Sequence, residues 1–283
     1  MEILTIVLAS LLSLGSGGGL VLDKIAQGKI RQQVISIEEQ RVRIDNQPNY
    51  RVVQGKVGRV RIASRGVRIE PGIRIAELDL ETDPLAVKLD EINLSSIDRL
   101  RESLVTPATG AARLVLHETD LNQALQSKKV RQQLQQTLNR LIASRAGSNN
   151  IRYEISEVQL DLRPKNRLQL AFQLSRPRPQ QASDLSRLGT SRPQNPSREL
   201  IISLELSLRV MNGQTIRLLD PKGTVNGRPM SPRLLNGFAT GISDHLNLNT
   251  LEADGILARI LQLEISEDNL ELVSFVRLET QQP

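Results

Sequence analysis

The sequence predicts an α+β fold in which a long, mostly antiparallel, twisted β-sheet wraps around two or three amphipathic helices. Many runs alternate apolar with polar residues, which indicates strands with one buried face. Two longer stretches, Thr119–Arg145 and Ser231–Leu246, carry leucines at helical spacing. Because so few helices must cover so many one-sided strands, a sheet curled around the helices is the arrangement we expect.

Twelve runs are predicted to be strands, and four stretches are predicted to be helices. The strands are expected at 41–45, 56–63, 72–83, 85–89, 112–118, 158–164, 167–174, 199–210, 215–219, 223–225, 261–267 and 269–278, and the helices at 23–36, 95–104, 119–145 and 231–246. In the third strand the apolar residues change parity, which predicts a β-bulge near Ala76.

The stretch 119–145 is the clearest helix, and its ends carry terminal signals. Asp120 and Gln123 have the spacing of a capping box, and Gly147 suits a helix end. Ser127 either breaks the run or caps a second helix. Each long helix is followed by a Leu-rich hairpin, so the chain holds either a weak internal repeat or two ordinary amphipathic hairpins.

The composition limits the kind of partner. The net charge is +6, which favours an anionic partner such as a membrane or a nucleic acid. Aromatic residues make up only 2% of the chain, and the bases of single-stranded nucleic acids usually stack on aromatic side chains. Nucleic acid is therefore disfavoured. The absence of cysteine excludes disulfides, thiolate nucleophiles and cysteine-based metal sites.

Two segments stand apart from the remaining chain, which we expect to be one domain at 23–280. Residues 1–22 contain an uncharged apolar run that suits an uncleaved anchor, a cleaved signal or an element packed on the domain. Lys24, Lys29 and Arg31 follow it, and by the positive-inside rule they favour a cytoplasmic domain. Residues 176–198 are rich in Arg, Pro and Ser and are expected to form a disordered loop insertion.

No catalytic signature is visible. His117 and His245 are the 2 histidines of the chain, and neither lies in a metal-binding or triad-like motif. Acidic residues such as Glu77 and Asp79 alternate with apolar ones, which is typical of a solvated strand face. We therefore expect a protein that is not an enzyme and needs no cofactor or metal.

The order of several stretches resembles the LmeA-like family of bacterial phospholipid-binding proteins. The stretches are LVLDKIAQGKIRQQ (20–33), QGKVGRVRIASRGVRI (54–69), GIRIAELDLETDPL (72–85), LVLHETDLNQAL (114–125) and GTVNGRPMSPRLLNGF (223–238). The resemblance implies a fold like that of tubular lipid-binding domains, a phospholipid ligand and an extracytoplasmic location. The last implication conflicts with the positive-inside rule.

The residues themselves suit an apolar channel with a basic rim. The expected apolar lining is Leu121, Leu125, Leu134, Leu138, Leu141, Leu235, Phe238 and Ile242, and the expected head-group contacts are Lys128, Lys129 and Arg131. The alternative is that these leucines form an ordinary core and the cations a solvated helix face. The protein would then be a membrane-anchored scaffold that docks a protein or an anionic surface through its basic loop.

Overall fold

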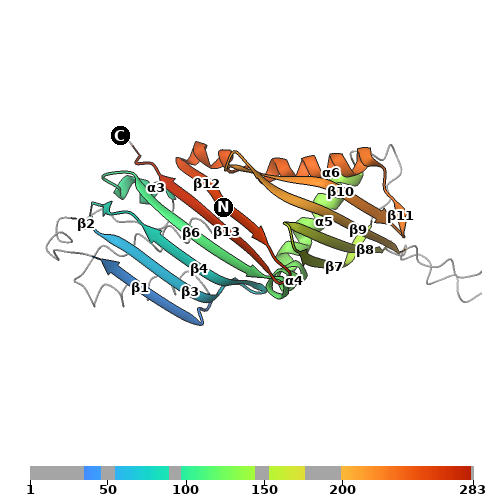
Figure 1. Cartoon of the computed structure of the whole chain (residues 1–283), viewed down its shortest axis with the longest axis horizontal. Coiled ribbons are helices and arrows are strands. Elements are labelled where there is room, and N and C mark those ends of the chain that lie inside the picture. The colour runs from blue at the N-terminus through green and yellow to red at the C-terminus, as the bar shows by residue number, and fades with distance from the viewer. Residues whose placement is uncertain (1–34, 46–54, 89–96, 144–152, 176–198, 282–283) are drawn as a thin grey trace, which may run out of the picture.

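The computed structural model describes residues 35–45, 55–88, 97–143, 153–175 and 199–281, and these form an elongated molecule built on two antiparallel sheets (Figure 1). The six-stranded sheet has the order β1 (Glu39–Asp45), β3 (Arg59–Glu70), β4 (Ile73–Thr82), β6 (Ala108–His117), β13 (Asn269–Leu278) and β12 (Ile256–Ile265). The five-stranded sheet has the order β11 (Arg228–Pro229), β10 (Thr215–Val225), β9 (Leu200–Met211), β8 (Arg167–Ser175) and β7 (Glu154–Arg163). A short pair, β2 (Lys56–Val57) and β5 (Leu85–Ala86), completes the strands described.

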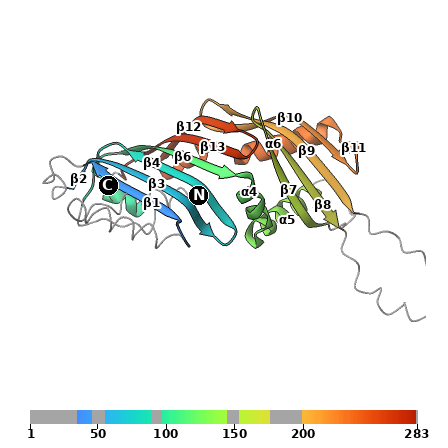
Figure 2. The ribbon, with the colours of Figure 1, turned by 60° about the horizontal axis from the view of Figure 1, so that its bottom comes forward.

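The described part of the chain contains few helices. They are α3 (Ile97–Ser103), α4 (Glu118–Gln126), α5 (Lys128–Ala143), α6 (Pro232–His245) and the 3₁₀-helix η5 (Leu248–Asp254). The mostly antiparallel sheet is confirmed, but its strands divide into two main sheets. Within the described residues neither sheet closes around the helices, because α4, α5 and α6 lie along the sides of the five-stranded sheet (Figures 1 and 2).

Ser127 separates α4 from α5 and caps the second of these helices. Its hydroxyl accepts a hydrogen bond from the Val130 amide at 3.4 Å, so the second of the two alternatives applies. The predicted capping box is wrong: α4 begins at Glu118, after His117, which makes no side-chain cap. Asp120 is instead buried, and its Oδ2 accepts a hydrogen bond from Arg74 at 2.8 Å.

The bulge predicted near Ala76 in β4 is wrong. Ile75 and Ala76 are both buried, yet the register with β3 is continuous through this point and shifts only between Arg68 and Glu70. Gly66 has a φ of +61°, in the left-handed region. The Glu38 side chain passes directly over Gly66 and reaches Arg74, so a glycine suits the conformation, and a Cβ there would require the Glu38 carboxylate to move.

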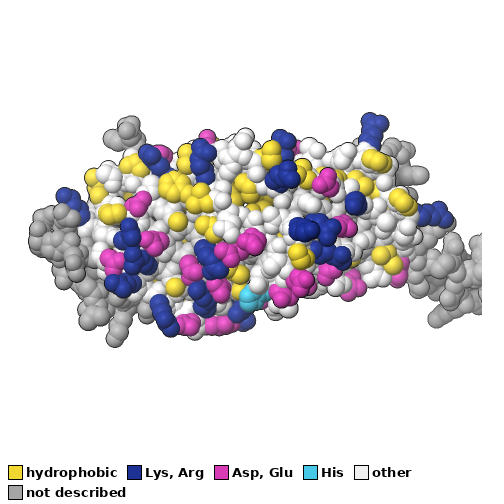
Figure 3. All heavy atoms as spheres, in the orientation of Figure 1, with side chains coloured by type: hydrophobic (Ala, Val, Ile, Leu, Met, Phe, Trp, Pro, Cys, Tyr) yellow, Lys and Arg dark blue, Asp and Glu magenta, His cyan; other side chains and the backbone are white. Residues whose placement is uncertain are grey.

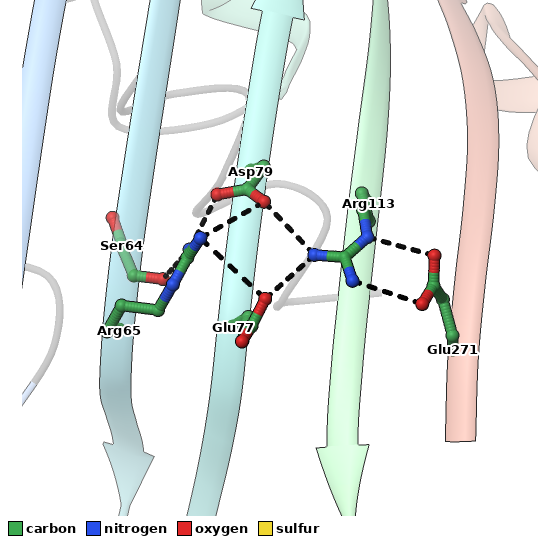
Figure 4. A network of polar contacts seen from close by, with 6 residues as sticks. All are labelled: Ser64, Arg65, Glu77, Asp79, Arg113 and Glu271. Atoms are coloured by element: carbon green, nitrogen blue, oxygen red, sulfur yellow. Dashed lines mark hydrogen bonds and ion pairs between the residues drawn. The ribbon is translucent and has the colours of Figure 1, made fainter. Parts of the chain in front are cut away.

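One face of the six-stranded sheet is apolar and the other is charged. The apolar face packs into the largest core cluster, which includes Val60, Ile62, Leu80, Leu85 and Leu278. On the other face, arginines and carboxylates alternate between neighbouring strands (Figures 3 and 4). This face is therefore a solvated surface stabilised by cross-strand ion pairs.

The centre of this charged face is a linear network across four strands (Figure 4). Arg65 on β3 lies 2.6 Å from Asp79 on β4, and Arg113 on β6 lies 2.7 Å from Glu77. Arg113 also donates two hydrogen bonds to Glu271 on β13, at 2.9 and 3.0 Å. The bonds to Glu271, and then to Glu77, raise the pKa of Arg113 above its usual range.

The two sheets meet where hairpin turns of one reach the edge strand of the other. Asn166, in the turn between β7 and β8, donates its amide to the carbonyl oxygen of Leu263 at 3.2 Å and accepts a hydrogen bond from the Ile265 amide at 2.7 Å. Gly213, in the turn between β9 and β10, accepts a hydrogen bond from the Ile260 amide at 2.6 Å. The three backbone groups that these turns bind belong to β12, the edge strand of the six-stranded sheet. Turns of the five-stranded sheet therefore occupy this part of the edge.

Candidate functional site

The apolar face of the five-stranded sheet consists of rows of side chains that run across the strands. One row joins Leu160, Leu170 and Leu204 and ends at Gly223, and a parallel row joins Val158, Phe172, Ile202 and Val225. Alternation along each strand places these residues on the same side of the sheet, and polar residues occupy the other side. Leu160, Leu170, Phe172 and Ile202 are only half-buried.

Helices cover this apolar face from its two sides. Leu125 and Leu134, from α4 and α5, pack with residues of β7, β8 and β9 in one cluster. Ala239 and Ile242, from α6, pack with residues including Leu206 and Leu218 in another. α4 and α5 pack along β7 and α6 packs on β10, so the strands β8 and β9 lie between these helices (Figure 1). We use the name trough for this half-buried apolar sheet face together with the flanking apolar side chains of α4, α5 and α6.

The wall formed by α4 and α5 is fixed to the edge of β7 by a series of polar side chains. From α4, Glu118, Asn122 and Gln126 hydrogen-bond to backbone groups of Leu162, Leu160 and Val158, each at 2.7 or 2.8 Å. From α5, Gln135 accepts from the Ile155 amide at 2.9 Å and donates to the Tyr153 carbonyl oxygen at 2.6 Å. These side chains satisfy backbone groups that an edge strand would otherwise leave unpaired.

The helix α4 is also fixed to the six-stranded sheet. Arg74 of β4 donates to Asp120 at 2.8 Å and to Glu38 at 3.0 Å. The hydrogen bonds to Glu38, and then to Asp120, raise the pKa of Arg74, while the Arg74 guanidinium lowers the pKa of Glu38. The wall formed by α4 is therefore fixed to both sheets.

The opposite wall, α6, lies close to the sheet because Gly223 has no side chain. A Cβ at Gly223 would lie 2.7 Å from Leu204, 2.8 Å from Leu235 and 3.0 Å from the sulfur of Met230. Ser231 caps α6 by accepting a hydrogen bond from the Leu234 amide at 3.4 Å. Leu235 consequently lies over the end of the row that Leu160, Leu170 and Leu204 form.

Five of the eight apolar residues predicted from the sequence are described with their side chains, and all five face this sheet. Leu121, Leu125 and Leu134 lie on one wall and Leu235 and Ile242 on the other. Leu138, Leu141 and Phe238 lie in the same helices, but their side chains are outside the described ones. The floor residues Leu160, Leu170, Phe172 and Ile202 were missing from the prediction, although strand alternation marks them.

The three predicted cations lie at the start of α5 and differ in their surroundings. Lys128 and Lys129 are exposed. The guanidinium of Arg131 donates to the carbonyl oxygens of Ile155 and Ser156, both at 3.0 Å. Arg131 thus contributes to the polar contacts that fix α5 to the edge of β7.

A separate hollow lies on the charged face of the six-stranded sheet. It has a volume of about 340 Å³, and its lining includes Arg43, Arg61, Asp79, Glu81 and Ala111. Arg61 lies 3.3 Å from Glu81, and Arg43 lies 2.7 Å from Asp45, so both arginines are paired with carboxylates. This hollow lies on the other sheet and is distinct from the trough. Within the described ranges, no three His, Asp or Glu side chains are grouped so that they could hold a metal ion.

The fold and the trough define an antiparallel β-protein with a partly open apolar face between helical walls. The chain belongs to the LmeA-like phospholipid-binding family, whose model matches residues 14–274. The resemblance seen in the sequence is thereby confirmed, and the family is one of lipid-binding proteins. None of the curated proteins and none of the solved structures compared with the chain matches it.

The predicted anchor at 1–22, the helix at 23–36 apart from its last residues, and the loop at 176–198 lie outside the described residues. Among the helices that are described, none has both the length and the apolar character needed to cross a bilayer.

Proposed function

We propose that the trough of the five-stranded sheet binds the acyl chains of a phospholipid or a similar amphiphile, without catalysis. The observation that carries this proposal is a set of half-buried apolar residues on the sheet face, flanked by helices at both sides: Leu160, Leu170, Phe172 and Ile202, from the two parallel rows. Membership of a phospholipid-binding family supports it. Each CH₂ group of a chain that leaves water for this surface contributes about 0.8 kcal/mol.

In this proposal, the apolar residues predicted from the sequence form the two walls of the trough. Leu121, Leu125 and Leu134, continued by Leu138 and Leu141, contact the chains from one side. Leu235, Phe238 and Ile242 contact them from the other. Leucine and isoleucine side chains suit flexible chains of varied length, because they offer apolar surface without a polar atom to satisfy.

The head group is proposed to lie at the start of α5. Lys128 and Lys129 are exposed there and donate charge-assisted hydrogen bonds to a phosphate. Arg131 takes part through the N–H groups that do not bind the β7 carbonyl oxygens. We further propose that the protein acts at a membrane, held by residues 1–22, on the extracytoplasmic side as the family resemblance implies.

Native mass spectrometry of the chain, purified without detergent, tests the proposal, with the extracted lipids identified in parallel. We expect a stoichiometric adduct with the mass of a phospholipid. A mass without adduct, together with no uptake of lipid from anionic vesicles, would contradict lipid binding. It would favour the alternative of an anchored scaffold that docks a partner through its basic loop at 176–198.

A further inference from the structure

The polar face of the five-stranded sheet carries arginines directly opposite one another. Arg209 of β9 and Arg217 of β10 are cross-strand partners, and both are exposed. Like charges in this position lower the stability of a sheet. Neither arginine has an ion-pair partner among the described residues, and Met211 and Ser207, two positions along β9 on either side of Arg209, carry no charge.

The six-stranded sheet shows how the same chain offsets such a pair. Arg43 and Arg61 are also cross-strand partners, but both bind Asp45, at 2.7 and 3.0 Å. At the turn of β7 and β8, the opposed Arg163 and Arg167 each have a carboxylate at 3.2 Å and 3.0 Å. The pair Arg209 and Arg217 therefore stands out because its repulsion is not offset within the described residues.

Exposed apolar side chains lie beside these arginines. Met211 is 36% exposed, and Leu261, which bulges from β12, is 63% exposed. The hydrogen bond from the Ile260 amide to Gly213 places this bulge against the turn that follows Met211. Arg259, also exposed, lies next to the same turn. Figure 3 shows basic side chains over the end of the five-stranded sheet nearest β12, with hydrophobic ones beside them.

We propose that this surface, the hairpin patch of Arg209, Met211, Arg217, Arg259 and Leu261, docks the protein on the anionic head groups of a phospholipid bilayer. The arginines bind phosphates, while Met211 and Leu261 enter the boundary between head groups and acyl chains. A bilayer fits both parts, because it presents a dense layer of anions above an apolar layer. The inference rests on the proposed action at a membrane and names the surface responsible.

Vesicle flotation with the full chain tests this proposal. The double variant Arg209→Gln/Arg217→Gln is compared with the wild-type chain on vesicles of phosphatidylglycerol and phosphatidylcholine, and on phosphatidylcholine alone. Each basic residue near an anionic surface contributes about a fivefold gain in partitioning, so we expect about 30-fold weaker binding to the anionic vesicles. Binding to phosphatidylcholine alone, which reports residues 1–22, is expected to stay unchanged.

A matched control removes two charges far from the patch, one on β11 and one at the start of α6. Arg228 and Arg233 are exposed and have no ion-pair partner among the described residues. Arg228→Gln/Arg233→Gln is expected to lower anionic binding by less than about threefold, as a change in net charge alone would. An equal loss in this control would overturn the proposal, because binding would then follow net charge and not the hairpin patch.

Two further variants guard against misfolding and against another partner. Arg217→Glu gives Arg209 an opposite charge, so it should fold at least as well as wild type yet lose anionic binding. Leu261→Ser should weaken binding without changing its dependence on salt.

Tight binding of an RNA oligonucleotide that the double variant loses, with vesicle binding retained, would overturn the bilayer as partner. Lipid adducts in native mass spectrometry report the trough separately.

Discussion

Asn122 of α4 holds both backbone groups of Leu160 on the edge strand β7. Its side-chain amide donates to the Leu160 carbonyl oxygen and its side-chain oxygen accepts from the Leu160 amide, both at 2.8 Å. The Asn122 side chain thus makes the two hydrogen bonds that a neighbouring strand would make with Leu160. The position of this helical wall is therefore set by contacts within the protein.

Replacing Asn122 with alanine should destabilise the protein by about 1–3 kcal/mol, because two partly buried backbone groups lose their partners. Urea unfolding measures the change. Gln123→Ala, at the exposed next position, is the matched control and should change the free energy of unfolding by less than about 0.5 kcal/mol. Equal effects of the two variants would show that the contact to β7 contributes little.

Replacing Gly66 with alanine should cost more than replacing Gly227 with alanine. Both glycines have positive φ, +61° and +74°, which costs an alanine about 1–2 kcal/mol. A Cβ at Gly66 would also collide with the Glu38 side chain, whereas a Cβ at Gly227 meets nothing within 4 Å. An alanine at Gly66 would move this carboxylate away from Arg74, so the Gly66 variant should be the less stable of the two. In a Glu38→Ala background this excess should vanish, and its persistence would contradict the crowding by Glu38.

The ion pair of Glu38 with Arg74 should make stability depend on pH in the acidic range. The hydrogen bond from Arg74 lowers the pKa of Glu38 below the ordinary value of 4.5. A lowered folded-state pKa stabilises the folded protein above the unfolded pKa, and this contribution disappears as the pH falls through the folded-state pKa. The stability difference between wild type and Glu38→Gln should be present at pH 7 and should shrink below about pH 4.5. A difference that does not change with pH would contradict the pair.

Replacing Leu134 with tryptophan should displace lipid while leaving the fold intact. Leu134 is half-buried on the wall of the trough, so a larger ring can occupy the space proposed for an acyl chain. Native mass spectrometry should show loss of the adduct. Leu206, only 2% exposed, is the control, because tryptophan there overpacks the core and should destabilise by about 1–3 kcal/mol. Equal destabilisation by both variants would mean that Leu134 is ordinary core.

Local patterns in the sequence predicted most elements but not their assembly. The alternation of 199–210 and the Asn226-Gly227 turn correspond closely to β9 and to the turn after β10. The runs 215–219 and 223–225 form one strand, because the register shift between Leu219 and Lys222 accommodates the residues between them. The division into two sheets depends on contacts such as those of Asn166 with β12, which no local pattern encodes.

Only part of the candidate site could be predicted, because local patterns do not show which elements will contact one another. Helical spacing identified Leu121, Leu125 and Leu134 as one apolar stripe, and the structure places that stripe on the five-stranded sheet. The polar stripe next to it, Glu118 and Asn122 continued by Gln126, has the spacing of a solvated face. Its actual partners are backbone groups of β7, and periodicity cannot distinguish them from water.

The occupied edge of β12 has a consequence for self-association. An open strand edge offers backbone groups to a second copy of the chain and so promotes aggregation. Between Ile260 and Ile265 three of these groups are bound by Asn166 and Gly213, which are both turn residues of the other sheet. The contacts that join the two sheets therefore also hinder this part of β12 from pairing with a strand of a second copy of the chain.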